Sequence, residues 1–483
     1  MERVKEALPW LLFTYLGAPL ALLALCWPKL GARGKDEPPE EALELAVVCL
    51  ALGPIAVATL TLFLFTAAPG SSYAFYRWTP VACFALLAAT RFRVFANMHA
   101  AARRGWERVL AADPGRDFAI PMILLIIVFN LWQQFSEASL TALHGNDALE
   151  YASIARILYE GRDAGVYLFS AADPGTGFYT PSTHPLGYAS MFLWNYLIQE
   201  QSTVLGLGKL VPLWAFTMCL CLLAVSLRRH SPFAVVAGAG LLFACPLLTY
   251  LVSYEHHVDP LLALGFLLSV FTGVMSIRRP SRRWCALAGA SLGACLLAHS
   301  LGLLVLPFFC ATFFLLSREP VSTRLQRLTA VVLVGCLIGG QQYLENTRER
   351  GRPIGDDNPI WKVERLEVKK WFQEDRGLTS QRNRIINGYF QSLTKPAYFG
   401  ILPWLGGLGV VVALWRRRFE DLFLRFVTSY LVLFYVALFG LTFVVGSDLI
   451  IRNPRYFVFT MPLLAYPAAL LCAGAYDRWF AGR

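Results

Sequence analysis

The chain repeats apolar runs of about 18 to 24 residues, and each run is long enough to cross roughly 30 Å of hydrocarbon as a helix. Backbone polar groups inside a bilayer must be satisfied internally, so a spanning segment forms a helix or part of a closed barrel, and barrels are built from alternating segments of about ten residues. The composition agrees with helices, because 56% of the residues are hydrophobic and only 16% are charged. The sequence therefore predicts an all-α polytopic integral membrane protein.

The distribution of charge gives an orientation. The net charge is +11, but most arginines flank apolar runs, where the positive-inside rule places them, so nucleic acid is not an expected partner. Between Arg91 and Asp117, six arginines face three acids, which predicts a cytoplasmic loop. Alternation from this loop predicts about thirteen spans, with the chain starting outside and ending inside. The expected spans are residues 8–27, 44–66, 75–94, 118–137, 204–227, 232–252, 260–277, 285–300, 302–317, 328–345, 399–415, 421–445 and 457–475. Residues 285–317 fit either one kinked helix or a short hairpin turning at 299–302.

These spans and loops divide the chain into four parts. We expect an N-terminal three-span extension with a basic cytoplasmic loop (1–117), a membrane core (118–345) that includes a first extracytoplasmic loop (138–203), a second extracytoplasmic loop (346–398) and C-terminal spans (399–483). The second loop contains WKVERLEVKKWFQE, whose pattern is amphipathic. An interfacial helix on the bilayer and an ordinary solvated loop helix both fit this pattern.

Ionisable residues concentrate on the outer side. The stretch from His144 to Tyr188 is the most polar of its length before residue 340. Ionisable groups at membrane depth are costly and tend to mark function, so several of them on one side predict an outward-facing polar cavity. For any single residue, a satisfied interfacial side chain is the alternative. The groups on this side are His144, His184, His256, His257, His299, Asp147, Glu150, Glu255, Asp259 and Asp448.

Two helices are expected within the first loop. Asp147 and Tyr151 are four residues apart on a predicted helix that runs to about Tyr159, so both face the same side. Asp147 near the start of that helix is favoured as an anion by the unpaired backbone amides, and it fits a capping residue as well as a catalytic one. Tyr179 and His184 precede a second apolar helix, at 186–197.

The motifs resemble those of a known family. Asp-x-x-x-Tyr in an outer loop and a His-Pro before the next helix are similar to the first large loop of polytopic glycosyltransferases with the GT-C fold, such as protein O-mannosyltransferases and aminoarabinose transferases of lipid A. Four later segments also resemble segments of this family and follow in the same order. Together with the first loop they cover about residues 118–475. They are CPLLTYLVSYEHHVDPLLALGFLL, AGASLGACLLAHSLGLLVLP, QQYLENTRERGRPIG and NPRYFVFTMPLLAY.

The resemblance implies a reaction and its partners. A sugar would pass from a polyprenyl-phosphate carrier to a lipid, glycan or protein acceptor on the outer face, with inversion at the anomeric carbon and with membrane lipids around the enzyme. Asp147 would be the general base. Arg455, with Arg452, would stabilise the leaving phosphate, although a lipid headgroup contact or an interfacial anchor also fits these arginines. The residues expected to bind substrate are Tyr151, Tyr179, His184, His256, Asp259, His299, Asn346, Arg452, Arg455 and Tyr456.

The chain departs from the family in three places. Many members carry Asp-Glu in the first loop, where this chain has Asn146-Asp147-Ala148. His299 stands where a lysine often follows the Gly-rich span, and the three spans before residue 118 are additional. A divalent cation is an open question, because His144, Asp147, His184, His256, His257 and Asp259 are of ligand type but have no diagnostic spacing.

Two other classes fit a chain of this kind. A secondary transporter would have about a dozen spans, and a membrane O-acyltransferase would use a histidine such as His184 or His299. Dependence on the donor separates the three, since only the glycosyltransferase needs a lipid-linked sugar. The charge pattern fits a bacterial inner membrane and an endoplasmic reticulum equally, and the lack of a C-terminal retention signal favours the bacterial membrane, with the active site on the periplasmic face.

Overall fold

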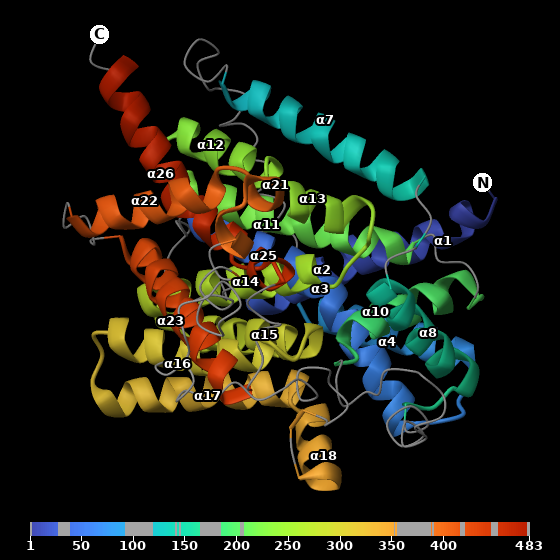
Figure 1. Cartoon of the computed structure of the whole chain (residues 1–483). Coiled ribbons are helices and arrows are strands. Elements are labelled where there is room, and N and C mark those ends of the chain that lie inside the picture. Colours follow the sequence, from blue (N-terminus) through green and yellow to red (C-terminus); the bar gives the residue numbers. More distant parts are fainter. Residues whose placement is uncertain are drawn as a thin grey trace, which may run out of the picture.

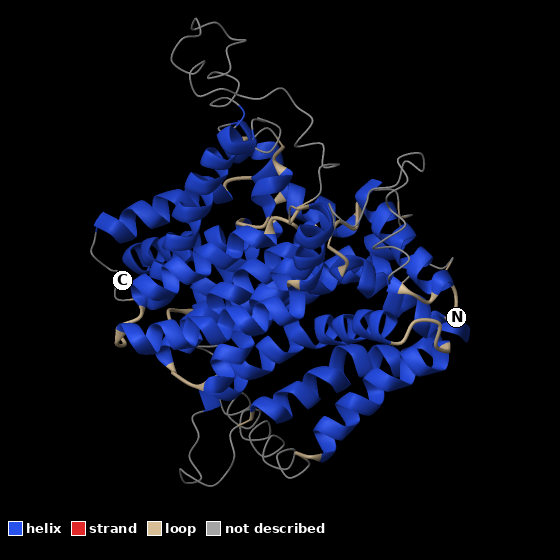
Figure 2. Cartoon of the chain, turned by 90° about the horizontal axis from the view of Figure 1, so that it is seen from below, coloured by secondary structure: helices blue, strands red, loops and turns tan. Residues whose placement is uncertain are grey.

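The computed structural model describes residues 2–27, 39–91, 119–140, 143, 146–164, 185–202, 207–351, 353–354, 388, 391–415, 421–445 and 453–480. Every regular element in these ranges is a helix (Figure 2). Six of them are long and apolar enough to cross a membrane, with up to seven spans if one bent pair counts as a single crossing. The expected all-α membrane architecture is therefore confirmed, and the chain is an integral membrane protein. The expected count of about thirteen spans is not confirmed.

The helices are labelled in Figure 1. In chain order they are α1 (Glu2–Leu12), a π-helical turn (Phe13–Gly17), α2 (Ala18–Cys26), α3 (Pro39–Ala67), α4 (Tyr73–Ala89), α7 (Ala119–Leu140), α8 (Asn146–Gly161), α10 (Gly187–Gln199), a 3-10 turn (Gly208–Leu210), α11 (Val211–Leu227), α12 (Pro232–Phe243), α13 (Pro246–Ser253), α14 (Asp259–Arg278), α15 (Arg282–Ala298), α16 (Gly302–Leu316), α17 (Val321–Gly339), α18 (Gln341–Arg350), α21 (Pro396–Phe399), α22 (Leu402–Trp415), α23 (Leu422–Val445), α25 (Arg455–Val458) and α26 (Met461–Phe480).

Helix α14 is the centre of the bundle (Figure 1). It is apolar on all sides and packs against α11, α15, α16, α23 and α26, so nearly its whole length is buried. It begins at Asp259 and ends at Arg278. At 1.5 Å per residue these ends lie about 30 Å apart, which matches the thickness of the hydrocarbon core. Asp259 and Arg278 therefore mark the two membrane faces of the bundle.

One expected span is broken. Residues 232–252 were expected to form a single helix, but α12 and α13 meet at an angle of 67°. Pro246 lies in the first turn of α13, and Cys245 before it is extended, with φ −87° and ψ 99°. A residue before proline avoids the helical region, so the chain leaves the helix after Phe243 and resumes it at Pro246.

A second interruption lies at 299–301. Helix α15 ends at His299, whose backbone is extended, and α16 starts at Gly302, so the segment forms two helices and not one kinked helix. A Cβ at Gly302 would lie 2.1 Å from the carbonyl oxygen of Cys295. Only glycine fits where the chain passes this close to the end of α15.

The N-terminal helices hold the first loop in place. Helix α10 packs against α8, α3 and α1, and Trp194 donates a hydrogen bond of 2.7 Å from Nε1 to Oγ1 of Thr14. At the far end of α8, Tyr73 stacks on Tyr159 at 4.5 Å and donates from its hydroxyl to the Tyr159 carbonyl. The additional N-terminal helices are thus a support for α8 and α10.

Candidate functional site

Four charged side chains from three distant parts of the chain meet at the Asp259 end of α14. His257 Nε2 lies 2.6 Å from Asp147 Oδ2, and its Nδ1 lies 3.2 Å from Asp259 Oδ2. The Arg455 guanidinium bridges the same two carboxylates, with 2.7 Å to Asp147 Oδ2 and 3.3 Å from Nε to Asp259 Oδ2. We call Asp147, His257, Asp259 and Arg455 the charged cluster. It places two carboxylates against two cations at one membrane face.

A tight turn between α13 and α14 orients the imidazole. His256 has a left-handed backbone, with φ 52°, and the His257 amide donates to the Leu251 carbonyl at 2.9 Å. Tyr188 donates from its hydroxyl to the His256 carbonyl at 2.5 Å, which fixes the turn against α10. The turn places the His257 imidazole within reach of both carboxylates.

The carboxylates and the guanidinium sit at helix starts. Asp147 lies in the first turn of α8 and Asp259 is the first residue of α14, positions where helix amides favour an anion. Arg455 opens the short helix α25, and its amide donates to Asn453 Oδ1 at 3.1 Å. Asp147 therefore does more than cap a helix, because it also contacts His257 and Arg455.

The cluster changes the acidity of its members. Burial by itself would lower the pKa of His257, but the adjacent Asp259 carboxylate and hydrogen bonds to Asp147 and Asp259 outweigh burial and raise this pKa to about 9. The imidazole is therefore a cation at neutral pH. The pKa of Arg455 is also raised, since the charges of Asp259 and Asp147 outweigh its burial.

Glu150 lies one turn beyond Asp147 on α8. Partial burial and the negative charge of Asp147 raise the pKa of Glu150 to about 7, while His257 and Arg455 act in the opposite direction. Its protonation thus changes near neutral pH, where a group can both take up and release a proton. Sequence reasoning placed Glu150 on the outer face but gave it no role.

The structure brings together only some of the expected residues. Asp147, Asp259 and Arg455 meet, and His299 lies near enough to Asp259 for their charges to interact. Tyr456 directly follows Arg455 and is half-buried. Several expected features lie outside the described residues. They are the binding residues Tyr179, His184 and Arg452, the ionisable residues His144 and Asp448, and the amphipathic segment at 361–374.

Three expected binding residues have contacts that support the fold. Tyr151 is buried and packs edge-to-face on Tyr188 at 5.1 Å. His256 forms the turn that orients His257. Asn346 donates from Nδ2 to the Pro353 carbonyl at 3.1 Å and so holds the turn after α18.

His257 is the member of the cluster that sequence reasoning missed as a binding residue. The sequence placed it among the ionisable groups of the outer side and among residues of metal-ligand type, and assigned substrate binding to its neighbour His256. Two consecutive residues cannot point the same way in a regular element, but the pair HH does not reveal which one faces the site. The signal that was available is the spacing His257-x-Asp259, which puts an imidazole beside the carboxylate that opens α14.

The cluster was also compared with a metal site. Among the residues that the structure describes, no three His, Cys, Asp or Glu side chains are arranged to hold one ion. The positive charge between the two carboxylates is the Arg455 guanidinium. Asp147 and Asp259 therefore have a protein cation where a metal would otherwise supply the charge.

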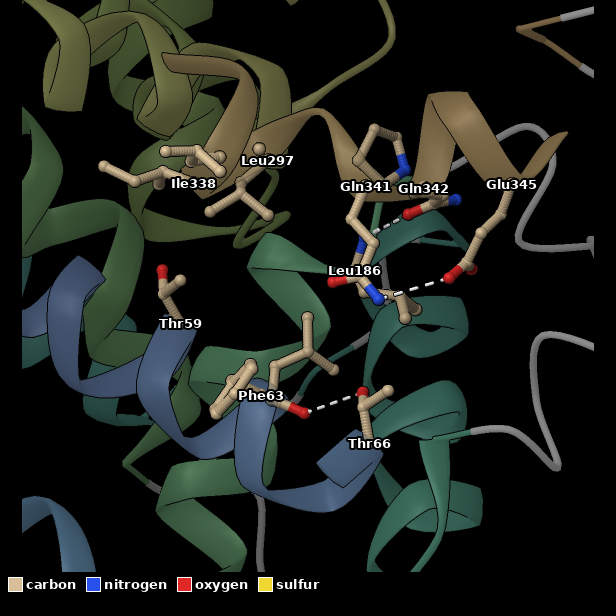
Figure 3. Close-up of a pocket in the computed structure, with 13 residues that line it drawn as sticks. Thr59, Phe63, Thr66, Leu186, Leu297, Ile338, Gln341, Gln342 and Glu345 are labelled. Atoms are coloured by element: carbon tan, nitrogen blue, oxygen red, sulfur yellow. Dashed lines mark hydrogen bonds between the residues drawn. The ribbon is translucent and has the colours of Figure 1, made fainter. Parts of the chain in front are cut away.

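A groove opens elsewhere in the bundle (Figure 3). Its volume is about 90 Å³, and α3, the residues just before α10, the ends of α15 and α17 and the start of α18 form its walls. Gln342 accepts a hydrogen bond from the Leu186 amide at 3.1 Å, and Gln341 donates to Glu345 at 3.1 Å. No member of the charged cluster lines it. The groove is thus separate from the charged cluster.

Comparison with known proteins gives a likeness of fold at low identity. No protein-family model and no curated protein matches the chain. The chain is similar to the solved structure of ArnT from Cupriavidus metallidurans in the apo state, with 17% identity, a TM-score of 0.49, and 75% of this chain and 62% of that chain covered. It is also similar to the oligosaccharyltransferase of Archaeoglobus fulgidus with zinc and sulfate, with 16% identity, a TM-score of 0.47, and 73% and 49% covered.

The chain is also similar to the oligosaccharyltransferase AglB from Archaeoglobus fulgidus in complex with an inhibitory peptide and a dolichol-phosphate, with 13% identity, a TM-score of 0.48, and 74% of this chain and 50% of that chain covered. The chain spans about half to three fifths of the length of these proteins.

Proposed function

We propose that this chain is a membrane glycosyltransferase that moves a sugar from a polyprenyl-phosphate carrier to an acceptor at the extracytoplasmic face. The observation that supports it most is the charged cluster, in which a carboxylate, an imidazolium and a guanidinium converge at one end of the central helix. Glycosyl transfer from a lipid phosphate needs a base for the acceptor and a cation for the leaving group, and the cluster supplies both.

Exposure separates the roles of the two carboxylates. The Asp147 side chain is 25% exposed, whereas Asp259 is 3% exposed and His257 is 1% exposed. A base must reach its substrate, so Asp147 takes the proton from the acceptor hydroxyl, and Asp259 holds His257 and Arg455 from behind. Asp147, His257 and Arg455 then keep one fixed geometry around the reacting oxygen.

Arg455 is suited to the leaving phosphate. Its side chain is 24% exposed and its guanidinium presents several donors in one plane, which matches phosphate oxygens. As the acceptor oxygen attacks the anomeric carbon, the bond from that carbon to the phosphate oxygen breaks and the phosphate leaves with the electron pair. Arg455 stabilises the charge that the phosphate gains. A single displacement of this kind inverts the anomeric centre.

The position of the cluster favours an enzyme over a transporter. Substrate sites of secondary transporters lie near the bilayer midplane, whereas the cluster lies at one end of α14. The positive-inside pattern assigns this end to the extracytoplasmic face, and we propose a bacterial inner membrane with the acceptor on the periplasmic side. The sugar is a hexose or a pentose, and the acceptor is a lipid, a glycan or a protein.

Radiolabelled transfer tests the proposal. Membranes that contain the chain are incubated with a panel of polyprenyl-phosphate sugars, and label that moves to any acceptor is counted. Glu160→Gln is the matched control for Asp147→Asn, because Glu160 lies on the same helix in an exposed pair with Arg156, and exposed pairs contribute little. We expect transfer by the wild type and by the control. Absence of transfer from every donor, together with solute movement across liposomes, would replace the glycosyltransferase with a transporter.

A further inference from the structure

A cavity of about 360 Å³ lies at the end of the bundle opposite the charged cluster. It is bounded by the start of α12, the start of α23 and the ends of α22 and α26, which gather at the upper left of Figure 1. Its wall residue Asp421 pairs with Arg278, the last residue of α14, at 3.0 Å. Since α14 is about 30 Å long, the cavity is at the other membrane face from Asp147.

Hydrogen bonds and ion pairs at Asp421 fix the wall of this cavity. Asp421 accepts from the Tyr466 hydroxyl at 2.5 Å and from the Phe423 amide at 3.0 Å, and His230 Nε2 lies 3.4 Å from its Oδ2. With Arg278, these contacts join α14, α23, α26 and the turn before α12 at one carboxylate. The helices around the cavity are therefore held apart at fixed positions.

The lining of the cavity combines apolar and charged side chains. Leu424, Leu470 and Leu471 supply apolar surface to its lining, while Asp477 and Arg478, which also line it, are exposed. A Cβ added at Gly474, which also lines it, would meet nothing within 4 Å. Its volume falls in the range of roughly 300–1,000 Å³ that is typical of small-molecule sites.

We propose that this cavity binds one phospholipid of the facing leaflet whose headgroup carries both a phosphate and a primary amine. The phosphate fits Arg478 and the ammonium fits Asp477, while part of an acyl chain covers the apolar part of the lining. Of the two acids in the lining, Asp421 is paired with Arg278, and Asp477 stands beside Arg478. This adjacent pair complements a zwitterion, whereas a purely anionic headgroup would bring its charge beside Asp477. The cavity opens at a membrane face, where such lipids are the most concentrated amphipathic ligands.

Lipid retention by the purified full chain tests this site. The chain is delipidated in detergent and mixed with phosphatidylethanolamine or phosphatidylglycerol, and bound lipid is counted by native mass spectrometry beside the thermal melting temperature. Gly474→Leu fills the cavity. Gly407→Leu is the matched control, because it adds the same side chain at an exposed position of α22 that also has no neighbour within 4 Å.

We expect the wild type and Gly407→Leu to retain one phosphatidylethanolamine and to melt at a higher temperature with it. Gly474→Leu should bind at least tenfold more weakly and show no such increase. A second pair, Asp477→Asn and Arg478→Gln, leaves the helix packing unchanged because both side chains are exposed, and each should weaken retention. Equal retention by Gly474→Leu and the wild type would overturn the site. Equal retention of phosphatidylglycerol by the wild type would overturn the proposed recognition of the amine.

Discussion

His257 Nε2 lies 2.6 Å from Asp147 Oδ2, although the two residues are 110 positions apart in the chain. The contact joins the first turn of α8 to the turn before α14, and Arg455 reaches the same carboxylate oxygen from α25. The proposed base is thus held by two cations from two other parts of the chain. Each can be removed separately, which makes their contributions measurable.

Replacing His257 should impair the reaction without unfolding the protein. His257→Gln removes the imidazolium that fixes Asp147, and a small displacement of a catalytic group can cost up to about a hundredfold in rate. His256→Gln is the matched control, since it changes the adjacent histidine while the backbone carbonyl that accepts from Tyr188 stays in place. Sugar transfer by the two variants, measured at equal amounts of folded protein, should be clearly lower for His257→Gln. Equal losses would mean that His257 has no special role.

The charge on His257 predicts a loss of stability at high pH. Its pKa is raised from 6.5 to about 9, so its pairing with Asp147 and Asp259 is fully present below pH 6.5 and is lost as the pH rises through 9. The shift corresponds to roughly 3 kcal/mol of stability for this buried group. Thermal unfolding in detergent between pH 6 and pH 10 should show this decline in the wild type and much less of it in His257→Gln. A variant that declines as steeply as the wild type would contradict the assignment.

Glu150 predicts a pH dependence near neutrality. Its pKa of about 7 lies above the usual value because burial and Asp147 disfavour its anion, so ionisation of Glu150 lowers stability as the pH rises from about 4.5 through 7. Glu150→Gln should therefore raise the melting temperature at pH 8 and leave it unchanged at pH 4.5. Melting curves at the two pH values decide the matter. An equal effect at both would mean that the charge of Glu150 is not responsible.

Arg455 should be irreplaceable by lysine. Its guanidinium contacts Asp147 through one nitrogen and Asp259 through another, and a single ammonium cannot reproduce both contacts with the same geometry. Arg455→Lys and Arg455→Gln should each lower transfer by about a hundredfold or more, the scale seen when one donor to a developing anion is removed. Arg156→Gln, at an exposed arginine of α8, is the control. Full activity of Arg455→Lys would mean that only the positive charge of Arg455 matters and not the geometry of its guanidinium.

Chelation should leave transfer unchanged. Arg455 and His257 already face the two carboxylates, so the charge of the cluster is balanced by protein groups. Transfer measured in the presence of excess EDTA should stay within about twofold of the untreated rate. Loss of activity that added magnesium or manganese restores would show that a metal acts at the cluster.

Local sequence predicted that the elements are helices, and it predicted three members of the charged cluster. Asp147 and Asp259 were recognised because acids beside long apolar runs are costly and stand out, and Arg455 because it begins the last apolar segment. The helix at 186–197 was placed within about two residues, since its apolar run is bounded by Pro185. Such features depend on neighbours in the chain and can be derived from them.

Other features depend on contacts between distant segments. The sequence gives no indication that α1 and α3 pack on α10, because Thr14 and Trp194 are 180 residues apart and each fits an ordinary apolar helix. The choice between His256 and His257 depends on a single left-handed residue in the turn. The break at Cys245-Pro246 was within reach of the sequence, since proline disfavours a helix in the residue before it, but the long apolar run around it favoured an unbroken span.

The central claim is that Asp147 is the base of a glycosyl transfer, and the most direct test is the rate of sugar transfer by Asp147→Asn from the donor that the wild type accepts. The amide has nearly the same shape but cannot take up the acceptor proton, so the rate should fall by about 10²–10⁴ while the chain remains inserted and folded. The control Glu160→Gln should transfer at the wild-type rate. Transfer at the wild-type rate by Asp147→Asn would contradict the account and leave Asp147 as a structural residue at the start of α8.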